Sequence, residues 1–181
     1  MRKHIYIAYT GGTIGMRPSS QGYVPAPGFL AETLANMPEF HREEMPLYTL
    51  HEYDELMDSS DMSPADWQHI ADDIAQHYEQ YDGFIILHGT DTMAYTASAL
   101  SFMLENLGKP VIVTGSQIPF AELRSDGQEN LLNALYIAAN YPIAEVSLYF
   151  NNKLLRGNRS RKVDADGFDA FDGFGARPDP G

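Results

Sequence analysis

Four short apolar runs, spread along the 181 residues, constrain the fold more than any other feature of the sequence. None of them alternates apolar with polar residues, which is typical of strands that are covered on both faces. Such strands occur in parallel sheets with helices packed on each side. The four runs are HIYIAY (4–9), GFIILH (83–88), PVIVTG (110–115) and EVSLYF (145–150).

Helical patterns lie between these runs. The clearest begins after Ser63, whose hydroxyl suits an N-cap, with Pro64 at the first helical position and Asp66 in the first turn. Two further helices are predicted over residues 92–107 and 125–140, where apolar residues recur at helical spacing. Strands that alternate with helices predict a three-layer α/β/α fold, with a mostly parallel sheet and helices on both faces.

Small, polar, turn-forming residues stand at the ends of three of these runs. The loops are TGGTIG (10–15), HGTDTM (88–93) and TGSQIP (114–119), and a segment before the second run adds Asp58, Ser59 and Ser60. A structural turn needs one glycine or aspartate, whereas these loops repeatedly supply hydroxyls and amide donors. Because ligands collect at the carboxyl ends of parallel strands, we expect the loops to form one site there.

The two threonines of the first loop have two interpretations each. A lone threonine after a strand is most simply a cap, but Thr13 is also a candidate nucleophile and Thr10 a candidate substrate contact. A threonine hydroxyl needs a base or a phenol within hydrogen-bond reach to lose its proton. The loop 16–27 has few apolar anchors and carries Tyr23, so as a lid it would bring a phenol to Thr13 and exclude water. Taken alone, Tyr23 is better explained as an ordinary half-buried aromatic.

The second loop places Thr90 and Asp91 between a buried strand and a helix start, where free backbone N–H groups favour an anion. Asp91 suits a simple N-cap, a carboxylate that holds a ligand ammonium, or both at once. Lys162 follows the last run and would shuttle the Thr90 proton if burial lowered its pKa; alternatively it belongs to a surface ion-pair cluster. His88 is interpreted as a packed, hydrogen-bonded residue rather than a catalyst.

Composition excludes several classes of function. The formal net charge of −13 disfavours nucleic acid and anionic membranes as partners, and the only basic patch is RGNRSRK (156–162). There is no cysteine, and no cluster of side chains at metal-ligand spacing, so we expect no disulfide, thiolate chemistry or metal site. The glycines of TGGTIG lack dinucleotide and P-loop spacing. With no apolar segment long enough for a signal peptide or a membrane span, we expect a cytoplasmic protein. The remaining inventory suits attack by an activated hydroxyl on a small carbonyl compound, with main-chain groups stabilising the oxyanion.

The motifs AYTGGTIGM, SSDM, HGTDTM, TGSQIP and RGNRSRKVDADGFDAF together resemble those of the bacterial type I, cytoplasmic L-asparaginases. The resemblance extends from about residue 4 to residue 172. It implies a flavodoxin- or Rossmann-like N-terminal domain that hydrolyses L-asparagine to L-aspartate and ammonia without metal or organic cofactor. It also implies a homodimer or a dimer of dimers for the full-length family.

The resemblance further implies a role for each matching residue. Thr13 matches the nucleophile that attacks the side-chain amide, and Tyr23 matches the phenol that assists it. Thr90, Asp91 and Lys162 match the second catalytic group, in which Asp91 also holds the substrate ammonium. The remaining implied substrate contacts are Asp58, Ser59 and Ser60 for the carboxylate and ammonium, and the main-chain donors of Gly12 and Thr90 for the oxyanion.

The resemblance also implies a second, smaller α/β domain, which we expect to be absent from this chain. We therefore expect residues 1–172 to form the catalytic domain, residues 173–181 a linker or tail, and the chain by itself to be weakly active or inactive. The aperiodic stretch 168–181 is typical of a linker or frayed tail. Two alternatives stay open: a subunit of a tRNA-dependent amidotransferase, and a non-catalytic fragment that binds an amino acid or serves assembly. The preference for asparagine over glutamine depends on the room in the pocket.

Overall fold

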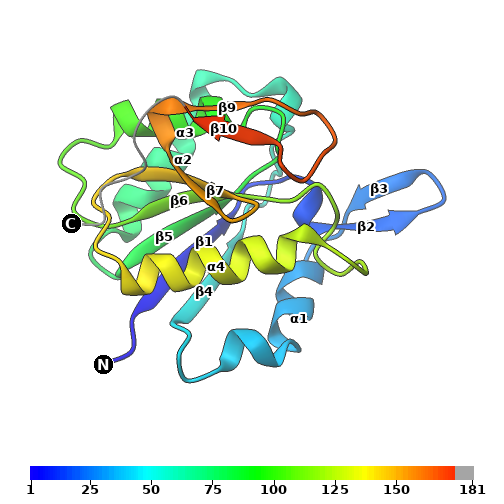
Figure 1. Ribbon diagram of the computed structural model, residues 1–181, viewed down its shortest axis with the longest axis horizontal. Coiled ribbons are helices and arrows are strands. Elements are labelled where there is room, and N and C mark those ends of the chain that lie inside the picture. The colour runs from blue at the N-terminus through cyan, green and yellow to red at the C-terminus, as the bar shows by residue number, and fades with distance from the viewer. Residues whose placement is uncertain (174–181) are drawn as a thin grey trace.

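The computed structural model describes residues 1–173 and contains a six-stranded sheet in the order β4-β1-β5-β6-β7-β8 (Figure 1). The first five strands in this order are parallel and β8 is antiparallel to β7. The strands are β1 His4–Tyr9, β4 Leu47–Glu52, β5 Gly83–Leu87, β6 Val111–Thr114, β7 Val146–Phe150 and β8 Lys153–Arg156.

The strand order reverses at β1, because the chain adds β4 on one side of it and β5, β6 and β7 on the other. This is the flavodoxin-like order, and its switch point is the crevice beyond the carboxyl ends of β1 and β5. The prediction of a mostly parallel sheet with helices on both faces is confirmed. The same topology explains why the loops after β1 and β5 adjoin each other.

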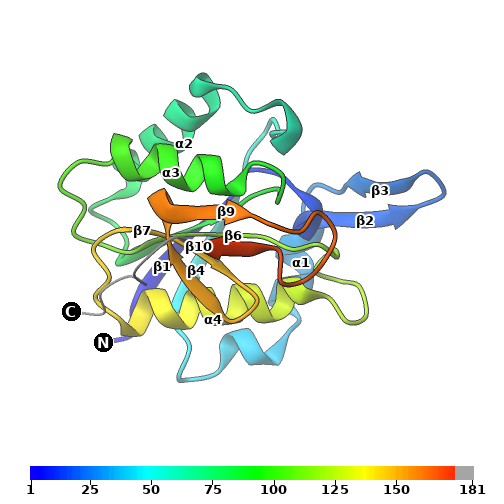
Figure 2. The same ribbon diagram turned by 45° about the horizontal axis from the view of Figure 1, so that its top comes forward.

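Helices cover both faces of the sheet, with α2 and α3 on one side and α1 and α4 on the other (Figure 2). Alternate residues of each strand therefore enter different cores: Tyr6 packs with α2 and α3, whereas Ile5 and Ile7 pack with α1 and α4. Burial on both faces is the reason that the central strands are continuously apolar. The helices are α1 Phe29–Ala35, α2 Pro64–His77, α3 Met93–Met103 and α4 Asp126–Asn140.

Helix α2 begins where the sequence predicts, and α4 begins and ends within one residue of the predicted range. At the start of α2, the backbone N and the Oγ of Ser63 donate to the Asp66 carboxylate at 2.8 and 2.7 Å. Helix α3 is shorter than predicted and ends at Met103, because the chain turns at Asn106, which has a φ of 53°. Leu107, which continues the apolar pattern, lies beyond the helix and packs half-buried against the core.

Several elements were not predicted. Strand β4 is half-exposed at the edge of the sheet, so it lacks the buried pattern of the other strands. The lid segment contains an antiparallel hairpin of β2 Met16–Ser19 and β3 Gly22–Pro25, which projects from the body of the molecule (Figures 1 and 2). Strand β9 Ser160–Lys162 pairs with β10 Phe171–Gly173 in a small separate sheet. The 3₁₀ turns are η1 Thr13–Gly15, η2 Pro38–His41, η3 Ser59–Asp61 and η4 Gly157–Arg159.

The prediction of a frayed tail from residue 168 is wrong for the part that the structure describes. Ala170 and Phe171 are buried, and the Phe171 ring packs edge-on against Phe150 with centroids 5.0 Å apart. These aromatic and small residues attach β10 to the core although no periodicity marks them. Residues 174–181, which make up most of the expected linker, lie outside the described residues.

Candidate active site

A cavity of about 440 Å³ opens at the carboxyl ends of β1 and β5, where the topology predicts a ligand site. Residues from four of the expected loops or segments surround it. Its lining residues include Gly12, Thr13, Asp58, Ser59, Thr90 and Asp91. The base of the lid hairpin contributes Met16 and Pro25, and the β9–β10 loop contributes Ala165 and Asp166.

The glycine pair allows the first two loops to come into direct contact. Gly12 has a φ of 99°, which L side chains rarely adopt. A Cβ atom on Gly12 would lie 2.5 Å from the backbone nitrogen of Gly89, which is closer than any real contact. The absence of a side chain at this position therefore lets the turns that carry Thr13 and Thr90 pack backbone to backbone.

Buried side chains fix the peptide groups that precede these two threonines. The Tyr9 hydroxyl donates to the Gly12 carbonyl at 2.8 Å, and Nδ1 of His88 donates to the Gly89 carbonyl at 2.6 Å. Because both peptide bonds are trans, the N–H groups of Thr13 and Thr90 point away from these buried donors. Burial raises the pKa of Tyr9 well above its usual value, so the phenol stays protonated and keeps donating.

His88 is structural, as the sequence predicted. It is 2% exposed, and burial lowers its pKa, so the ring is neutral. Since Nδ1 donates to a carbonyl, Nε2 accepts from the hydroxyl of Thr96, 2.8 Å away. Thr96 in turn accepts from the indole N–H of Trp67 at 3.0 Å. The ring is thus held at both nitrogens and has no lone pair left for a substrate.

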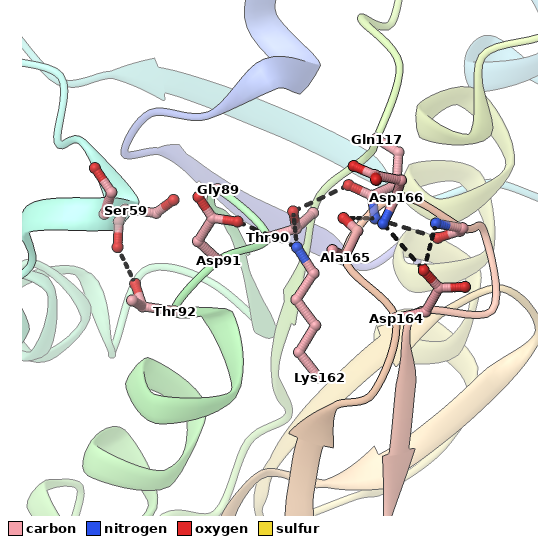
Figure 3. Close-up of polar contacts among 12 residues, drawn as sticks. Ser59, Gly89, Thr90, Asp91, Thr92, Gln117, Lys162, Asp164, Ala165 and Asp166 are labelled. Carbon is pink, nitrogen blue, oxygen red and sulfur yellow. Dashed lines mark hydrogen bonds and ion pairs between the residues drawn. The ribbon is translucent and has the colours of Figure 1, made fainter.

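Thr90 lies at the centre of a hydrogen-bonded group that joins four segments (Figure 3). Nζ of Lys162 donates to Thr90 Oγ1 at 3.0 Å and to Asp91 Oδ1 at 3.2 Å. The Thr90 hydroxyl donates to Oε1 of Gln117 at 3.0 Å. Nε2 of Gln117 donates to the carbonyls of Ala165 and Gly167, both at 3.2 Å. In this state the lysine ammonium is the donor to Thr90; with the proton removed, the same nitrogen would be placed to accept the hydroxyl proton.

Strand β9 carries Lys162 to this group from a sheet separate from the main one. The lysine side chain is 16% exposed, whereas that of Asp91 is 64% exposed. A largely covered ammonium that pairs with an exposed carboxylate is restricted in position by its neighbours. The ion pair therefore holds Lys162 in place against Thr90 and leaves the outer side of Asp91 open to a ligand.

The segment from Asp58 to Ser60 contributes unevenly. The backbone N–H and the hydroxyl of Ser60 donate to Asp58 Oδ1 at 2.9 and 2.8 Å. These bonds, the backbone one first, lower the pKa of Asp58, so its carboxylate is charged at neutral pH. Asp58 and Ser59 line the cavity, whereas Ser60 is exposed and its hydroxyl points to Asp58.

Three sequence interpretations differ from the structure. Tyr23 lies on the projecting hairpin, is 47% exposed and is not among the lining residues, so this structure does not bring its phenol to the cavity. Thr10 is buried and its hydroxyl donates to the Leu87 carbonyl at 2.8 Å, which makes it a strand-to-strand tie and not a substrate contact. The N-cap of α3 is Thr92 and not Asp91, whose carboxylate is paired with Lys162.

Gln117 and Thr92 bind neighbouring groups of the site and were missed as individual residues. Both belong to motifs that the sequence analysis identified, TGSQIP and HGTDTM, but nothing in the sequence assigned a role to either residue. The backbone N–H of Gln117 donates to the Asp126 carboxylate at the start of α4, at 2.9 Å to Oδ2. Burial raises the pKa of the Asp126 carboxyl, and the backbone N–H groups of Gln117 and Ile118 act in the opposite direction. This bond fixes the loop from which Gln117 reaches Thr90.

Two features are absent from residues 1–173. No group of three or more His, Cys, Asp or Glu side chains in this range is arranged to hold a metal ion. No helix in the same range is long and apolar enough to cross a membrane.

Comparison with known proteins gives consistent matches along the chain. A family model described as "Asparaginase, N-terminal" matches residues 4–178. L-asparaginase 1 of Escherichia coli K12 is 76% identical over 170 residues, which cover 94% of this chain and 50% of that protein.

Solved structures agree with the sequence matches. L-asparaginase I from Vibrio cholerae superposes with a TM-score of 0.92 at 74% identity, covering 98% of this chain and 53% of that one. A probable cytoplasmic L-asparaginase from Campylobacter jejuni superposes with a TM-score of 0.79 at 28% identity, covering 95% of this chain and 52% of that one. The chain therefore spans about half the length of the relatives that it matches.

Proposed function

The chain belongs to the asparaginase family, and on that premise we propose that it is the N-terminal catalytic domain of an amidohydrolase that converts L-asparagine to L-aspartate and ammonia. The observation that carries the proposal is the convergence of two threonine loops and one lysine on the same cavity. Thr13 and Thr90 both line it, and Lys162 is hydrogen-bonded to Thr90. Hydroxyls with an amine beside them suit nucleophilic attack on an amide carbonyl.

In the proposed reaction, the Thr13 hydroxyl attacks the side-chain amide carbon of asparagine and forms an acyl-enzyme ester with release of ammonia. Water then hydrolyses the ester and gives L-aspartate. Thr90 and Lys162 move the protons: the Lys162 amine, in its deprotonated form, takes the proton that the Thr13 hydroxyl loses, by way of Thr90, and returns it to the leaving amide nitrogen. The Thr90–Lys162 distance of 3.0 Å supports direct transfer between these two groups.

Charge on the substrate carbonyl oxygen needs donors that are fixed before the reaction. We propose the backbone N–H groups of Thr13 and Thr90 for this role. Tyr9 and His88 hold the preceding carbonyls on the buried side, which supports an orientation of both N–H groups toward the cavity. The resemblance implied the main-chain N–H of Gly12 as an oxyanion donor. We propose the N–H of the next residue, Thr13, in its place.

The outer part of the cavity suits the amino acid head of the substrate. We propose that the carboxylates of Asp58 and Asp91 hold its ammonium, with Ser59 at its carboxylate and Ser60 acting through Asp58. Tyr23 is proposed to assist Thr13 only when the hairpin closes over the cavity. The hairpin of β2 and β3 begins at Met16 and ends at Pro25, and both of these residues line the cavity.

Because the chain spans about half of its relatives, the activity, assembly and location of the whole protein are proposals. We propose a cytoplasmic homo-oligomer, a homodimer or a dimer of dimers, in which residues 1–172 are one domain. The structure named above from Campylobacter jejuni is described as cytoplasmic, which supports the location. We also propose that the part present here turns over asparagine slowly without the other half.

Ammonia release from L-asparagine tests the function, measured for the chain and for Thr13→Ala. We expect release by the unchanged chain and none above background by Thr13→Ala, which should still bind L-asparagine in calorimetry. Thr33→Ala is the matched control, since the Thr33 hydroxyl donates to the Phe29 carbonyl within α1 and its loss should leave the rate unchanged. Binding without any ammonia release would favour the non-catalytic fragment. Release that requires a charged tRNA would favour the amidotransferase subunit, and an active Thr13→Ala would refute the nucleophile.

A further inference from the structure

We propose that Thr92 is a positioning residue that fixes the Asp58–Ser60 segment against the loop of Thr90 and so sets the affinity for the amino acid head of the substrate. The inference rests on the proposed function, because it assigns Thr92 to the substrate-binding side of that site. Thr92 does not line the cavity, so it acts through Ser59 and not by touching the ligand.

The hydroxyl of Thr92 is not used in the way that its position would suggest. Thr92 is the N-cap of α3, and a threonine there normally accepts a bond from an N–H of the first turn. No such side-chain bond is made, and the hydroxyl instead donates to the backbone carbonyl of Ser59 at 2.6 Å (Figure 3). The partner is 33 residues away in the sequence, so the bond ties two loops together.

The segment that Thr92 holds has few other restraints. Inside it, Asp58 binds Ser60 through two short-range bonds, and the Asp61 N–H donates to the Asp58 carbonyl. Among residues 1–173, the Thr92 bond is the only hydrogen bond from a side chain outside the segment to residues 58–61. The nearest anchor before it is the bond from the Met57 N–H to the Thr10 carbonyl at 2.7 Å.

The position of Ser59 matters because it packs directly on the backbone before Thr90. A Cβ atom on Gly89 would lie 2.3 Å from Oγ of Ser59, so the serine occupies the space that any side chain at Gly89 would need. Asp58, Ser59, Gly89 and Thr90 together line the cavity. A small shift of the Ser59 carbonyl therefore changes the distance between the head-group contacts and the reacting groups.

Two variants remove the Thr92 hydroxyl, and two controls keep a hydroxyl donor at position 92. Thr92→Val is nearly isosteric and Thr92→Ala is the smaller alternative should valine not fold. Thr92→Ser keeps the donor. Ser101→Ala is the matched control on the same helix, since the Ser101 hydroxyl donates to the Ala97 carbonyl within α3. Each protein is compared by melting temperature, by calorimetric binding of L-aspartate, by L-asparagine kinetics and by deuterium uptake of residues 58–61.

We expect Thr92→Val and Thr92→Ala to bind L-aspartate about three- to tenfold more weakly, the effect of losing one hydrogen bond. The KM for L-asparagine should rise by a similar factor with kcat within about threefold, because the reacting groups are not touched. Deuterium uptake across residues 58–61 should rise, and Thr92→Ser and Ser101→Ala should match the unchanged chain.

Folded variants without the hydroxyl that keep both the affinity and the deuterium uptake would overturn the inference. A loss in Thr92→Ser as large as in Thr92→Val would also overturn it, since packing and not the hydrogen bond would then be responsible. Failure of the unchanged chain to bind L-aspartate would refute the proposed function instead. In that case the deuterium uptake still decides whether Thr92 restrains the segment.

Discussion

Substituting Gly12 by alanine tests whether contact between the first two loops sets the geometry of the site. The added Cβ would lie 2.5 Å from N and 2.7 Å from Cα of Gly89, and 2.9 Å from the carbonyl carbon of His88. All three are backbone atoms, so no side chain can rotate to relieve the overlap. The turns must move apart by about 1 Å to restore an ordinary van der Waals contact.

The same substitution also strains the backbone, and the two effects have different sizes. Gly12 has φ 99° and ψ 168°, a region that is essentially restricted to glycine. Alanine there should cost about 1–3 kcal/mol of stability, which a domain of this size tolerates. A displacement of about 1 Å between the nucleophile loop and the Thr90 loop should lower kcat about a hundredfold.

Gly28→Ala separates these effects. Gly28 has a φ of 78° and nothing within 4 Å of the point that a Cβ atom would occupy, so alanine there adds positive-φ strain without an overlap. Ammonia release and melting temperature are measured for both variants. We expect both to lose stability and only Gly12→Ala to lose most of its rate. A folded Gly12→Ala protein within threefold of the normal rate would refute the view that the loop contact sets the catalytic geometry.

Three further predictions concern other groups. Lys162→Met should lower the rate about 10²–10⁴-fold with little change in melting temperature, because its partner Asp91 is largely exposed; a loss below tenfold would count against proton transfer. Asp73→Ala removes the acceptor of the Tyr53 hydroxyl, 2.8 Å away, and of a second buried tyrosine hydroxyl. It should lower the free energy of unfolding by about 2–6 kcal/mol in urea, and a loss under about 1 kcal/mol would contradict this. The lowered pKa of His88 means that the unfolded chain binds more protons below pH ~6.5, so stability should fall as pH falls through this range. His88→Gln should show a shallower fall between pH 7 and 5.5, and an unchanged slope would refute the assignment.

The central part of the fold could be predicted because burial on both faces leaves a continuous apolar signal. Strands β1, β5, β6 and β7 carry that signal and were located within about one residue. Strand β4 was missed because an edge position leaves its residues half-exposed, and β10 because three residues are too few for a period. The pattern over residues 92–107 predicts too long a helix, since its apolar spacing continues into a turn that only the backbone at Asn106 reveals.

The site was predictable to the extent that its residues follow strands. Thr13 and Thr90 lie in the loops that directly follow β1 and β5, so topology alone brings these loops to one edge. Lys162 is different, because it reaches Thr90 from a three-residue strand in a separate sheet. Its sequence context fitted a surface ion-pair cluster equally well, and the family resemblance favoured the site. Tyr23 shows the limit of the approach: the lid segment and the family resemblance single out the residue, but the hairpin holds it half-exposed and outside the cavity lining.

Contacts between the loops explain why the motifs contain the residues they do. The space beside Gly12 is filled by the backbone of Gly89, and the space beside Gly89 is filled by the side chain of Ser59. The Ser59 carbonyl is in turn held by the Thr92 hydroxyl. Each of these glycines is required because atoms of another motif fill the space that a side chain would need. The residues of one motif are therefore constrained by the packing of its neighbour. We therefore treat three parts of the chain as one packing unit: the TGGT loop, the HGTDT loop and Ser59. A substitution in any one of them should disturb the ligand contacts that the others make.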